Sequence, residues 1–376
     1  MDALMLPLNW QRVRLGDIGK PCMCKRVMKH QTTRYGEIPF YKIGTFGNTA
    51  DAFISKKLFL EYKTKYSFPK KGDILISASG TIGRAVIYDG KPAYFQDSNI
   101  VWIDNDETLV KNDFLFYAYS NVKWNTEHTT ILRLYNDNFR NTLIPLPPLN
   151  EQSAIANILS DLDRYLYALD ALILKKEGVK KALSFELLSQ RKRLKGFNQA
   201  WQRVRLGDIA NYLTSNLSAE QIAQQGKIKV YDVNNFIGYT DTTFISDKPY
   251  ISIVKDGSVG RVRILPPKTN ILSTMGALIA NHRTTTEFLF YLLSNFDFKN
   301  FTSGSIIPHI YFKDYKEKTI FLPPLNEQSA IANILSGLDN EIASLKNKKR
   351  QFENIKKALN HDLMSAKIRV LKKSVL

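Results

Sequence analysis

Apolar residues recur at alternating steps of four and three along two long stretches of the chain. The first stripe runs through Ile155, Leu159, Leu162, Leu166, Leu169 and Ile173, and resumes at Leu183 and Leu187. The second stripe runs through Ile331, Leu335, Leu338, Ile342, Leu345, Phe352, Leu359 and Leu363. Lysines interrupt both stripes, at Lys176 and Lys180 and at Lys349 and Lys356. This a/d spacing predicts two long helices that pair as a coiled coil.

The sequence Leu-Pro-Pro-Leu-Asn precedes each stripe. Pro147 and Pro148 are expected to end the preceding strand, and Asn150 is a favourable helix N-cap with Glu151 in the first turn. The same signals recur at Pro323, Pro324, Asn326 and Glu327. The first helix is therefore expected to begin at Asn150 and to end near Lys195.

Short runs rich in β-branched and aromatic residues, separated by Gly, Asp and Asn, lie ahead of each helix. The first set comprises "IPFYKIG", "GDILISA", "RAVIY" and "NIVWID", and the second comprises "IKVYDV", "YISIV" and "RVRIL". One helix is expected within each set, around Asp113–Ser120 and near Thr286–Ser294. These patterns predict two small, β-rich α+β domains.

The two halves of the chain are copies of one another. "LPPLNEQSAIANILS" occurs at 146–160 and 322–336, and "WQRVRLGDI" occurs at 10–18 and 201–209. "AFIS" at 52–55 resembles "TFIS" at 243–246, and "GTIGRAVIY" at 80–88 resembles "GSVGRVRIL" at 257–265. The displacement falls from 191 (201 minus 10) to 176 (322 minus 146), so the second copy is 15 residues shorter. We expect it to lack a counterpart of roughly Lys56–Ala78, and two domain-sized copies indicate a duplication.

The order of the copies divides the chain into four segments. They are a first domain at 1–145, a helical segment at 146–196, a second domain at 197–321 and a second helical segment at 322–376. Because the second domain begins at the far end of the first helix, a short route back requires the two helices to run antiparallel. The expected architecture is a pseudo-two-fold dumbbell, in which two α+β domains are separated by a spacer of two antiparallel helices.

Sequence identity between the copies is concentrated at the helix starts. A coiled coil does not require matching solvent-facing residues, yet Glu151, Gln152, Ser153 and Asn157 recur as Glu327, Gln328, Ser329 and Asn333. Either both helix starts contact two copies of one partner, or both pack against their domains in an equivalent way. The domain interiors have diverged, notably at Asn121–Arg140 and Phe296–Lys313, which fits two different targets or drift after duplication.

Charge points to a polyanionic partner. Lysine and arginine outnumber aspartate and glutamate by 53 to 35, which gives a net charge of +18 and a pI near 9.6. Such an excess favours nucleic acid before acidic lipid, although a solubilising surface explains it equally simply. No apolar run approaches the roughly 18 residues of a membrane span, and no secretory leader is evident, so the expected compartment is the cytoplasm. The two cysteines, Cys22 and Cys24, are expected to be free thiols.

Strong catalytic patterns are missing from the sequence. We find no phosphate-binding loop, no G-x-G-x-x-G, no H-E-x-x-H and no acidic Asn/Asp-Pro-Pro-aromatic motif of amino-methyltransferases. Asp51 with Glu61 and Lys63 resembles a nuclease metal site, but so loose a spacing arises readily by chance. We therefore expect a protein that is not an enzyme and has no metal site.

Basic, amide and aromatic residues interleave at His128–Arg140 and Ser303–Lys316. Arg and Lys neutralise phosphates, and Asn reads adenine in the major groove. Arg84 and Arg261 follow matching glycine turns whose backbone can approach a phosphate closely. For each single residue a solvated loop is the simpler interpretation. The candidate DNA-binding residues are Arg84, Arg133, Tyr135, Asn136, Asn138, Arg140, Arg261, Ser303, Ser305, His309 and Lys313.

The combined motifs resemble the specificity subunit of type I restriction–modification systems. They are tandem W-x-x-V-x-L-G-D-I, an interior G-T-I-G-R turn, and tandem L-P-P-L-N-E-Q-x-x-I-A-x-I-L-S-x-L-D, and they cover nearly the whole chain. The resemblance implies two target recognition domains that each read half of a split double-stranded DNA site. It implies spacer helices that set the unread gap between the halves. The shortened second domain raises the question of equal reading power.

The resemblance also implies partners. The subunit would have no catalytic site and would assemble with two methylase subunits, which methylate adenine with S-adenosylmethionine. Restriction subunits that use ATP and Mg²⁺ would join the same complex. The implied methylase-docking residues are Asn150, Glu151, Gln152, Ser153, Asn157, Asn326, Glu327, Gln328, Ser329 and Asn333.

Two other functions remain open. A silent specificity protein would serve as a scaffold that binds methylase subunits without active DNA reading. A self-contained nuclease or methylase is disfavoured by the missing motifs.

Overall fold

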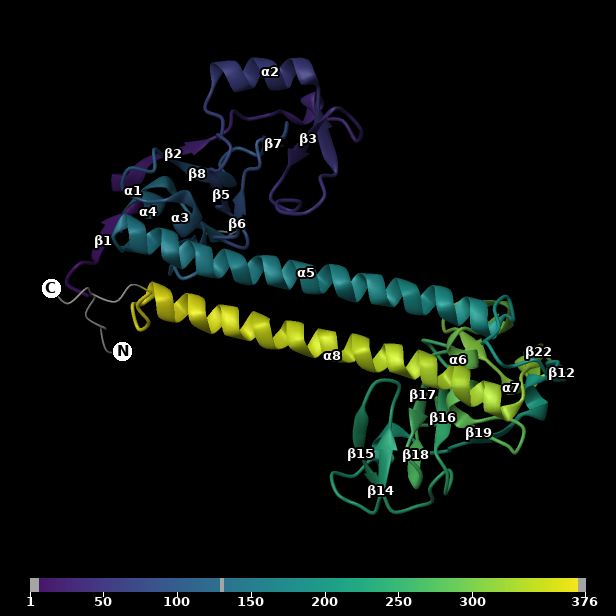
Figure 1. Cartoon of the computed structure of the whole chain (residues 1–376). Coiled ribbons are helices and arrows are strands. Elements are labelled where there is room, and N and C mark those ends of the chain that lie inside the picture. The colour runs from purple at the N-terminus through teal and green to yellow at the C-terminus, as the bar shows by residue number, and fades with distance from the viewer. Residues whose placement is uncertain (1–6, 129–131, 371–376) are drawn as a thin grey trace. The chain divides into compact units, whose positions relative to one another are not determined.

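The computed structural model describes residues 7–128 and 132–370 (Figure 1). Thr129–Ile131, within one predicted DNA-binding segment, and the first six residues, in which a leader was sought, lie outside the described residues. Two compact units make up the chain. Unit 1 comprises Met1–Leu169 and Lys349–Leu376, and unit 2 comprises Asp170–Lys348. This division cuts across both long helices, so it does not test the four-segment boundaries expected from the sequence.

The globular part of unit 1 contains two main sheets. The larger sheet is antiparallel, in the order β2 (Gly19–Met23), β8 (Ile100–Asn105), β5 (Ile74–Ser77) and β6 (Ala85–Ile87). The smaller sheet has the order β4 (Ala52–Ile54), β3 (Ile38–Tyr41) and β7 (Tyr94–Phe95). Two further pairs are β1 (Gln11–Arg14) with β11 (Leu143–Leu146), and β9 (Glu127–His128) with β10 (Leu132–Arg133). The helices are α1 (Leu15–Ile18), α2 (Lys56–Lys65), α3 (Asn112–Tyr119) and α4 (Asn136–Asn141).

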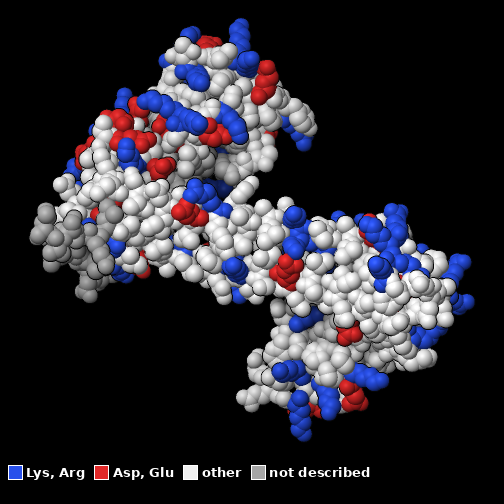
Figure 2. Space-filling view, viewed as in Figure 1, with Lys and Arg blue, Asp and Glu red and all other residues white. Residues whose placement is uncertain are grey.

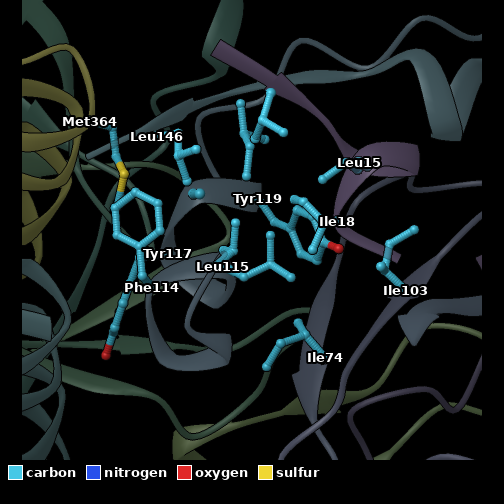
Figure 3. Close-up of a cluster of buried hydrophobic side chains, with 14 of the residues drawn as sticks. Leu15, Ile18, Ile74, Ile103, Phe114, Leu115, Tyr117, Tyr119, Leu146 and Met364 are labelled. Carbon is cyan, nitrogen blue, oxygen red and sulfur yellow. The ribbon is translucent and has the colours of Figure 1, made fainter. Parts of the chain in front are cut away.

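Helix α3 organises the main core of unit 1 (Figure 3). Its side chains Phe114 and Leu115 are fully buried, together with Leu15 of α1 and Ile74 of β5. Met364, from the end of the chain's last long helix, belongs to the same cluster. The core therefore joins the domain to a segment far away in the sequence.

Unit 2 repeats this topology. Its larger sheet has the order β13 (Ala210–Thr214), β19 (Met275–Ala280), β16 (Tyr250–Val254) and β17 (Val262–Leu265). Its smaller sheet has the order β15 (Phe236–Thr240), β14 (Ile228–Tyr231) and β18 (Thr269–Ile271). The pairs β12 (Gln202–Arg205) with β22 (Thr319–Leu322) and β20 (Thr302–Ser303) with β21 (His309–Ile310) follow the same plan. Helices α6 (Thr286–Ser294) and α7 (Phe312–Tyr315) correspond to α3 and α4.

Two expectations about the repeat are wrong. Strand β5 has a counterpart in β16, which holds the same place in its sheet, so the missing segment does not extend to Ala78. Among the described helices and strands of unit 1, the one without a counterpart in unit 2 is α2. Ala52–Ile54 of "AFIS" forms β4, whereas Thr243–Ser246 is not a strand, and β15 in unit 2 takes the place that β4 has in unit 1. Strand pairing, rather than the short sequence match, identifies the equivalent residues.

The long helices are α5 (Leu149–Leu188) and α8 (Leu325–Met364), of 40 residues each. The carbonyl of Pro148 already accepts hydrogen bonds from the amides of Glu151 and Gln152, so Asn150 lies inside the first turn rather than at the N-cap. Helix α5 ends at Leu188, before the expected Lys195. The prediction of two long helices is confirmed, with small shifts at their ends.

The two helices run antiparallel within each unit. In unit 1 the ring of Tyr165 lies 4.7 Å from that of Phe352, and Glu151, earlier in α5, contacts Arg369, which follows α8. In unit 2, Lys176 pairs with Glu341. Three of the lysines that interrupt the apolar stripes, Lys176, Lys180 and Lys356, thus form ion pairs across the helix interface.

Candidate functional site

A glycine-containing hairpin and a two-stranded ribbon meet at one surface of each globular domain. They are the β5–β6 hairpin and the β9–β10 ribbon in unit 1, and the β16–β17 hairpin and the β20–β21 ribbon in unit 2. In unit 1 the amide of Gly80, in the β5–β6 turn, donates to Leu132 O at 3.1 Å, and the amide of Leu134 donates to Ala78 O at 2.9 Å. In unit 2 the amide of Gly257 donates to Pro308 O at 2.9 Å, in the same arrangement. The predicted DNA-binding turns and the predicted DNA-binding segments therefore lie together in both units.

The second glycine of each turn is required by its surroundings. Gly83 has φ +83°, and a Cβ there would lie 2.1 Å from Trp124 Nε1. Gly260 has φ +79°, and its Cβ would lie 2.6 Å from a ring carbon of Phe298. Positive φ and close aromatic packing both exclude larger residues. The G-x-x-G-R pattern thus shapes the turn that presents Arg84 and Arg261.

The unit 1 candidates are spread over this surface. Arg84 is exposed, and its guanidinium donates to Asn48 Oδ1 at 3.4 Å. Arg133 lies on β10 opposite Ser79. Exposed Tyr135 directly precedes α4, where Asn136 is the first residue and Asn138 is half-buried. These five remain predictions as DNA contacts.

Arg140 has a packing role that the sequence did not suggest. Its backbone oxygen and side chain pass over Gly16, where a Cβ would lie 3.1 Å from Arg140 Cβ. Lys316 passes over Gly207 in the same way, with a corresponding distance of 3.2 Å. These are the glycines of the two W-x-x-V-x-L-G-D-I copies, so this part of the motif serves the fold of each domain.

The unit 2 candidates surround the β20–β21 ribbon. Ser303 and Ser305 are exposed. His309 Nδ1 lies 2.7 Å from Asp256 Oδ1 in the facing turn. The Lys313 ammonium lies 5.6 Å from the centre of the Tyr311 ring. Exposed Arg261 follows the glycine turn.

The helix starts contain two buried carboxylates. Trp10 Nε1 donates to Glu151 Oε2 at 3.0 Å, and Arg369 donates from two nitrogens to the same carboxylate at 2.7 and 2.9 Å. In unit 2, Trp201 Nε1 donates to Glu327 Oε2 at 3.0 Å, and Arg193 forms the equivalent two bonds. Glu151 is 2% exposed and Glu327 is 0% exposed. Each carboxylate ties together a domain, its following helix and the segment after the other long helix.

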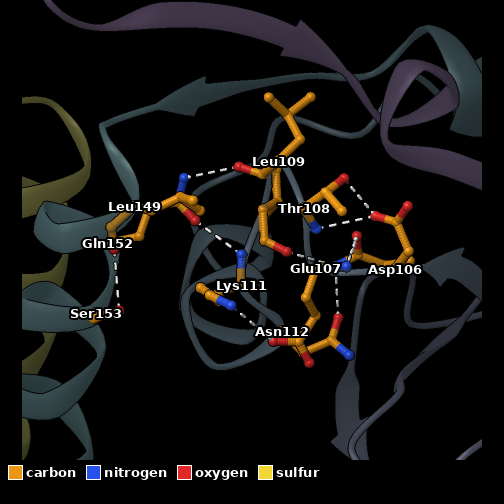
Figure 4. A network of polar contacts seen from close by, with 11 residues as sticks. Asp106, Glu107, Thr108, Leu109, Lys111, Asn112, Leu149, Gln152 and Ser153 are labelled. Carbon is orange, nitrogen blue, oxygen red and sulfur yellow. Dashed lines mark hydrogen bonds and ion pairs between the residues drawn. The ribbon is translucent and has the colours of Figure 1, made fainter.

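The neighbouring glutamines are also fully buried. Gln152 accepts a hydrogen bond from the Lys111 amide at 2.8 Å and donates to the carbonyl of Leu109 (Figure 4). It also donates to the carbonyl of Pro147. Gln328 accepts from Thr285 N and donates to the carbonyls of Arg283 and Pro323. Each glutamine therefore holds the loop before α3 or α6 against the helix start.

Burial corrects part of the predicted docking surface. Glu151, Gln152, Glu327 and Gln328 are committed to packing within the chain, which is the second of the two explanations left open by the sequence. The remaining candidates are exposed and spaced along one helix face. They are Asn150, Ser153 and Asn157, and Asn326, Ser329 and Asn333.

A tyrosine–aspartate–lysine cluster recurs beside each domain. Tyr117 of α3 donates to Asp163 Oδ2 at 2.8 Å, and Asp163 pairs with Lys356. Tyr291 of α6 donates to Asp339 Oδ2 at 2.9 Å, and Asp339 pairs with Lys180. Burial, with the neighbouring carboxylate, raises the pKa of both tyrosines, so each stays a hydrogen-bond donor.

Each lysine comes from the long helix that does not follow the domain it contacts. Sequence reasoning missed this set, although a signal was present. "KKAL" at 180–183 recurs at 356–359, at the same displacement of 176 as the helix starts.

Other polar groups have ordinary surroundings. Asp51 pairs with Lys42, and Glu61 pairs with Lys65 within α2. Within residues 7–128 and 132–370, no group of three or more His, Cys, Asp and Glu side chains could hold a metal ion. Burial raises the pKa of the Cys24 thiol to about 12. In the same residues, no helix is long and apolar enough to cross a membrane.

Comparison with known proteins gives matches along most of the chain. A family model described as the type I restriction modification DNA specificity domain matches residues 7–176 and 198–354. A putative type I restriction enzyme specificity subunit of Haemophilus influenzae is 62% identical over 152 residues, which are 40% of this chain and 40% of that relative. The MjaVIII type I restriction enzyme specificity subunit of Methanocaldococcus jannaschii is 26% identical over 414 aligned residues, which cover 98% of this chain and 95% of the relative.

Solved structures share the fold. The S subunit of a type I restriction–modification system from M. genitalium has a TM-score of 0.63 at 20% identity, with 96% of this chain and 98% of that chain covered. A chain from a structure on the complex assembly and conformational transition of a type I system has a TM-score of 0.57 at 16% identity, with the same coverage. The fold common to them has two tandem domains with long helices between them.

Proposed function

The chain belongs to the type I restriction–modification DNA specificity family, and on that premise we propose that it is the non-catalytic DNA-reading subunit of a type I complex. Each globular domain reads one half of a split double-stranded site. Helices α5 and α8 set the number of unread base pairs between the halves. Methylation and cleavage belong to the other subunits of that complex.

The observation that carries this proposal is the repeated hairpin-and-ribbon surface. The same backbone contacts hold it in both units, through Gly80 in one and Gly257 in the other. The side chains presented there differ, with Arg133 in unit 1 and His309 in unit 2. One scaffold with two sets of side chains suits the reading of two different half-sites. Figure 2 supports a polyanionic partner, since lysine and arginine side chains are prominent on the visible surface of both units.

Two methylase subunits dock on the exposed faces of the helix starts. The supporting observation is that the fifteen-residue repeat keeps not only its buried residues but also exposed Asn150, Ser153 and Asn157, which recur in unit 2. The glutamate and the glutamine are buried within the chain, whereas these three side chains are exposed, and the contacts of Asn150 and Ser153 are hydrogen bonds within the first turns of the helix. A partner present in two copies would require the same face twice.

The cofactors of the reaction belong to the partners. Methylase subunits supply S-adenosylmethionine chemistry, and restriction subunits supply ATP- and Mg²⁺-dependent translocation and cleavage. The complex acts in the cytoplasm, where its DNA substrate lies.

Methylation mapping tests the proposal directly. Genomic DNA is sequenced for methyladenine from cells that express the cognate methylase with and without this chain. We expect a chain-dependent motif of two unrelated halves around a fixed gap, and exchange of one globular domain should change one half only. A stable complex with an active methylase but no chain-dependent motif would instead identify a silent scaffold.

A further inference from the structure

The turn of the β20–β21 ribbon carries two apolar side chains into solvent. Ile306 is 92% exposed and Ile307 is 54% exposed. Among the described residues of unit 2, Ile306 is the most exposed large apolar side chain. Removing apolar surface from water lowers the free energy, so exposed apolar side chains of this kind are suited to burial against a partner.

The ribbon is anchored on both sides. Ser303 pairs with His309 across the ribbon, and the carbonyl of Pro308 accepts a hydrogen bond from the amide of Gly257 at 2.9 Å. His309 Nδ1 lies 2.7 Å from Asp256 Oδ1. Gly304 has φ +92°, and a Cβ there would lie 2.2 Å from Ile307 O, so the turn closes tightly. The backbone thus holds the two isoleucines at a fixed place.

The residues around the Ile306–Ile307 tip of the ribbon favour a polyanionic partner. From Lys299 to Lys313 the chain contains no aspartate or glutamate, and Asp256, which faces the ribbon, lies against His309. Exposed Lys313 follows the ribbon, and exposed Arg261 follows the turn that the ribbon contacts. Exposed Ser303 and Ser305 precede the two isoleucines and offer groups that donate and accept hydrogen bonds. A membrane surface would favour a broader apolar area than these two side chains.

The shape of the β20–β21 ribbon favours the major groove of DNA as its binding site. A two-stranded β-ribbon fits the major groove of B-form DNA, where the C5-methyl group of thymine is the apolar feature of the base edges. We propose that Ile306 contacts the C5-methyl group of a thymine in the half-site read by unit 2, with β20–β21 in the major groove. This assignment rests on the proposed DNA-reading function and makes Ile306 a specificity-determining residue.

Uracil substitution tests the contact, because deoxyuridine differs from thymidine only by that methyl group. The full chain, assembled with its methylase, is titrated with duplexes in which each thymine of the mapped site is replaced in turn. For the wild type we expect one position where the loss of the methyl group weakens binding about fourfold. That factor is the effect on the dissociation constant of burying one methylene-sized group. Ile306→Ala should bind both duplexes equally at that position, and Ile306→Val, which keeps a branched apolar side chain, should retain the preference.

Each outcome decides the assignment. A wild-type complex that binds its site but shows no uracil penalty at any position overturns it, as does a penalty that persists in Ile306→Ala. If Ile306→Ala instead reduces DNA bending without changing the thymine preference, the side chain acts as a wedge between base pairs and the methyl contact is wrong. A complex that binds no specific duplex contradicts the proposed function itself.

Discussion

At the scale of single residues, the buried glutamates Glu151 and Glu327 each join three parts of the chain through hydrogen bonds. Each accepts one hydrogen bond from a tryptophan and two from an arginine. A buried carboxylate is tolerated when charge-assisted bonds satisfy its oxygens, and removal of one partner then leaves the others unpaired in a dry site.

Glu327→Ala should therefore destabilise the protein strongly. It would leave the Arg193 guanidinium and Trp201 Nε1 without their acceptor, at a cost of about 3–5 kcal/mol in the free energy of unfolding, measured by urea denaturation. The control is Glu317→Ala, because Glu317 pairs with Arg205 on the surface and such exposed pairs contribute under about 1 kcal/mol. Similar losses for the two variants would contradict the structural role.

The burial of Glu151 and Gln152 could not be predicted from the sequence. Recurrence of Glu151 and Gln152 in the second copy was compatible with a partner surface or with internal packing. The choice depends on Trp10 and Arg369, which lie 141 and 218 positions away from Glu151 along the chain. Such distant contacts leave no local pattern, so burial of a polar residue could not be predicted. Glycine turns are local, and the turns before Arg84 and Arg261 were predicted correctly, whereas the role of the two arginines as DNA contacts stays a prediction.

At the scale of elements, the β5–β6 hairpin depends on two glycines with different surroundings. Both have positive φ, +68° at Gly80 and +83° at Gly83. A Cβ at Gly80 would meet nothing within 4 Å, whereas a Cβ at Gly83 would strike the indole of Trp124. The two positions thus separate backbone strain from overpacking.

Gly83→Ala should cost more stability than Gly80→Ala. Backbone strain alone predicts a loss of about 1–2 kcal/mol for Gly80→Ala. Displacement of Trp124 should add about 1–3 kcal/mol for Gly83→Ala. Thermal and urea unfolding measure both losses, and Gly80→Ala is the matched control. Equal losses would show that Trp124 moves aside freely.

Among the elements, the runs rich in β-branched and aromatic residues correctly predicted strands β3, β5, β6 and β8 in unit 1 and β14, β16 and β17 in unit 2, and helices α3 and α6 lie where they were expected. Helix α2 was missed because "KKLFLEYKTK" has no clear apolar period and only Phe59 is buried. A weak signal existed in Ser55, whose hydroxyl accepts a hydrogen bond from the Leu58 amide as an N-cap. The β20–β21 strands of two residues are too short to show alternation.

At the scale of the whole molecule, each unit is built from both long helices. Helix α5 begins in unit 1 and ends in unit 2, and α8 begins in unit 2 and ends in unit 1. The tyrosine–aspartate–lysine clusters follow this exchange, because Lys180 of α5 serves the second domain and Lys356 of α8 serves the first.

Substitution of either lysine should therefore affect the domain that is distant in sequence. Lys180→Met should speed amide hydrogen exchange in α6 and leave α3 unchanged, whereas Lys356→Met should do the reverse. Both pairs are partly exposed, so each loss should be about 1 kcal/mol or less. Each variant is the control for the other. Faster exchange in the same helix for both variants would contradict the crossed arrangement.

The attachment of each domain to the helices uses side chains that are the same in both halves. A domain bounded by W-x-x-V-x-L-G-D-I and L-P-P-L-N-E-Q brings its own tryptophan, tyrosine, glutamate and glutamine, and it meets an arginine and a lysine at either position. Homologous recombination at both bounding blocks, WQRVRLGDI before the domain and LPPLNEQSAIANILS after it, would then exchange an entire domain without breaking one of these contacts. Such an exchange would leave both long helices unchanged and, on the proposed function, would replace the preference for one half-site in a single genetic event.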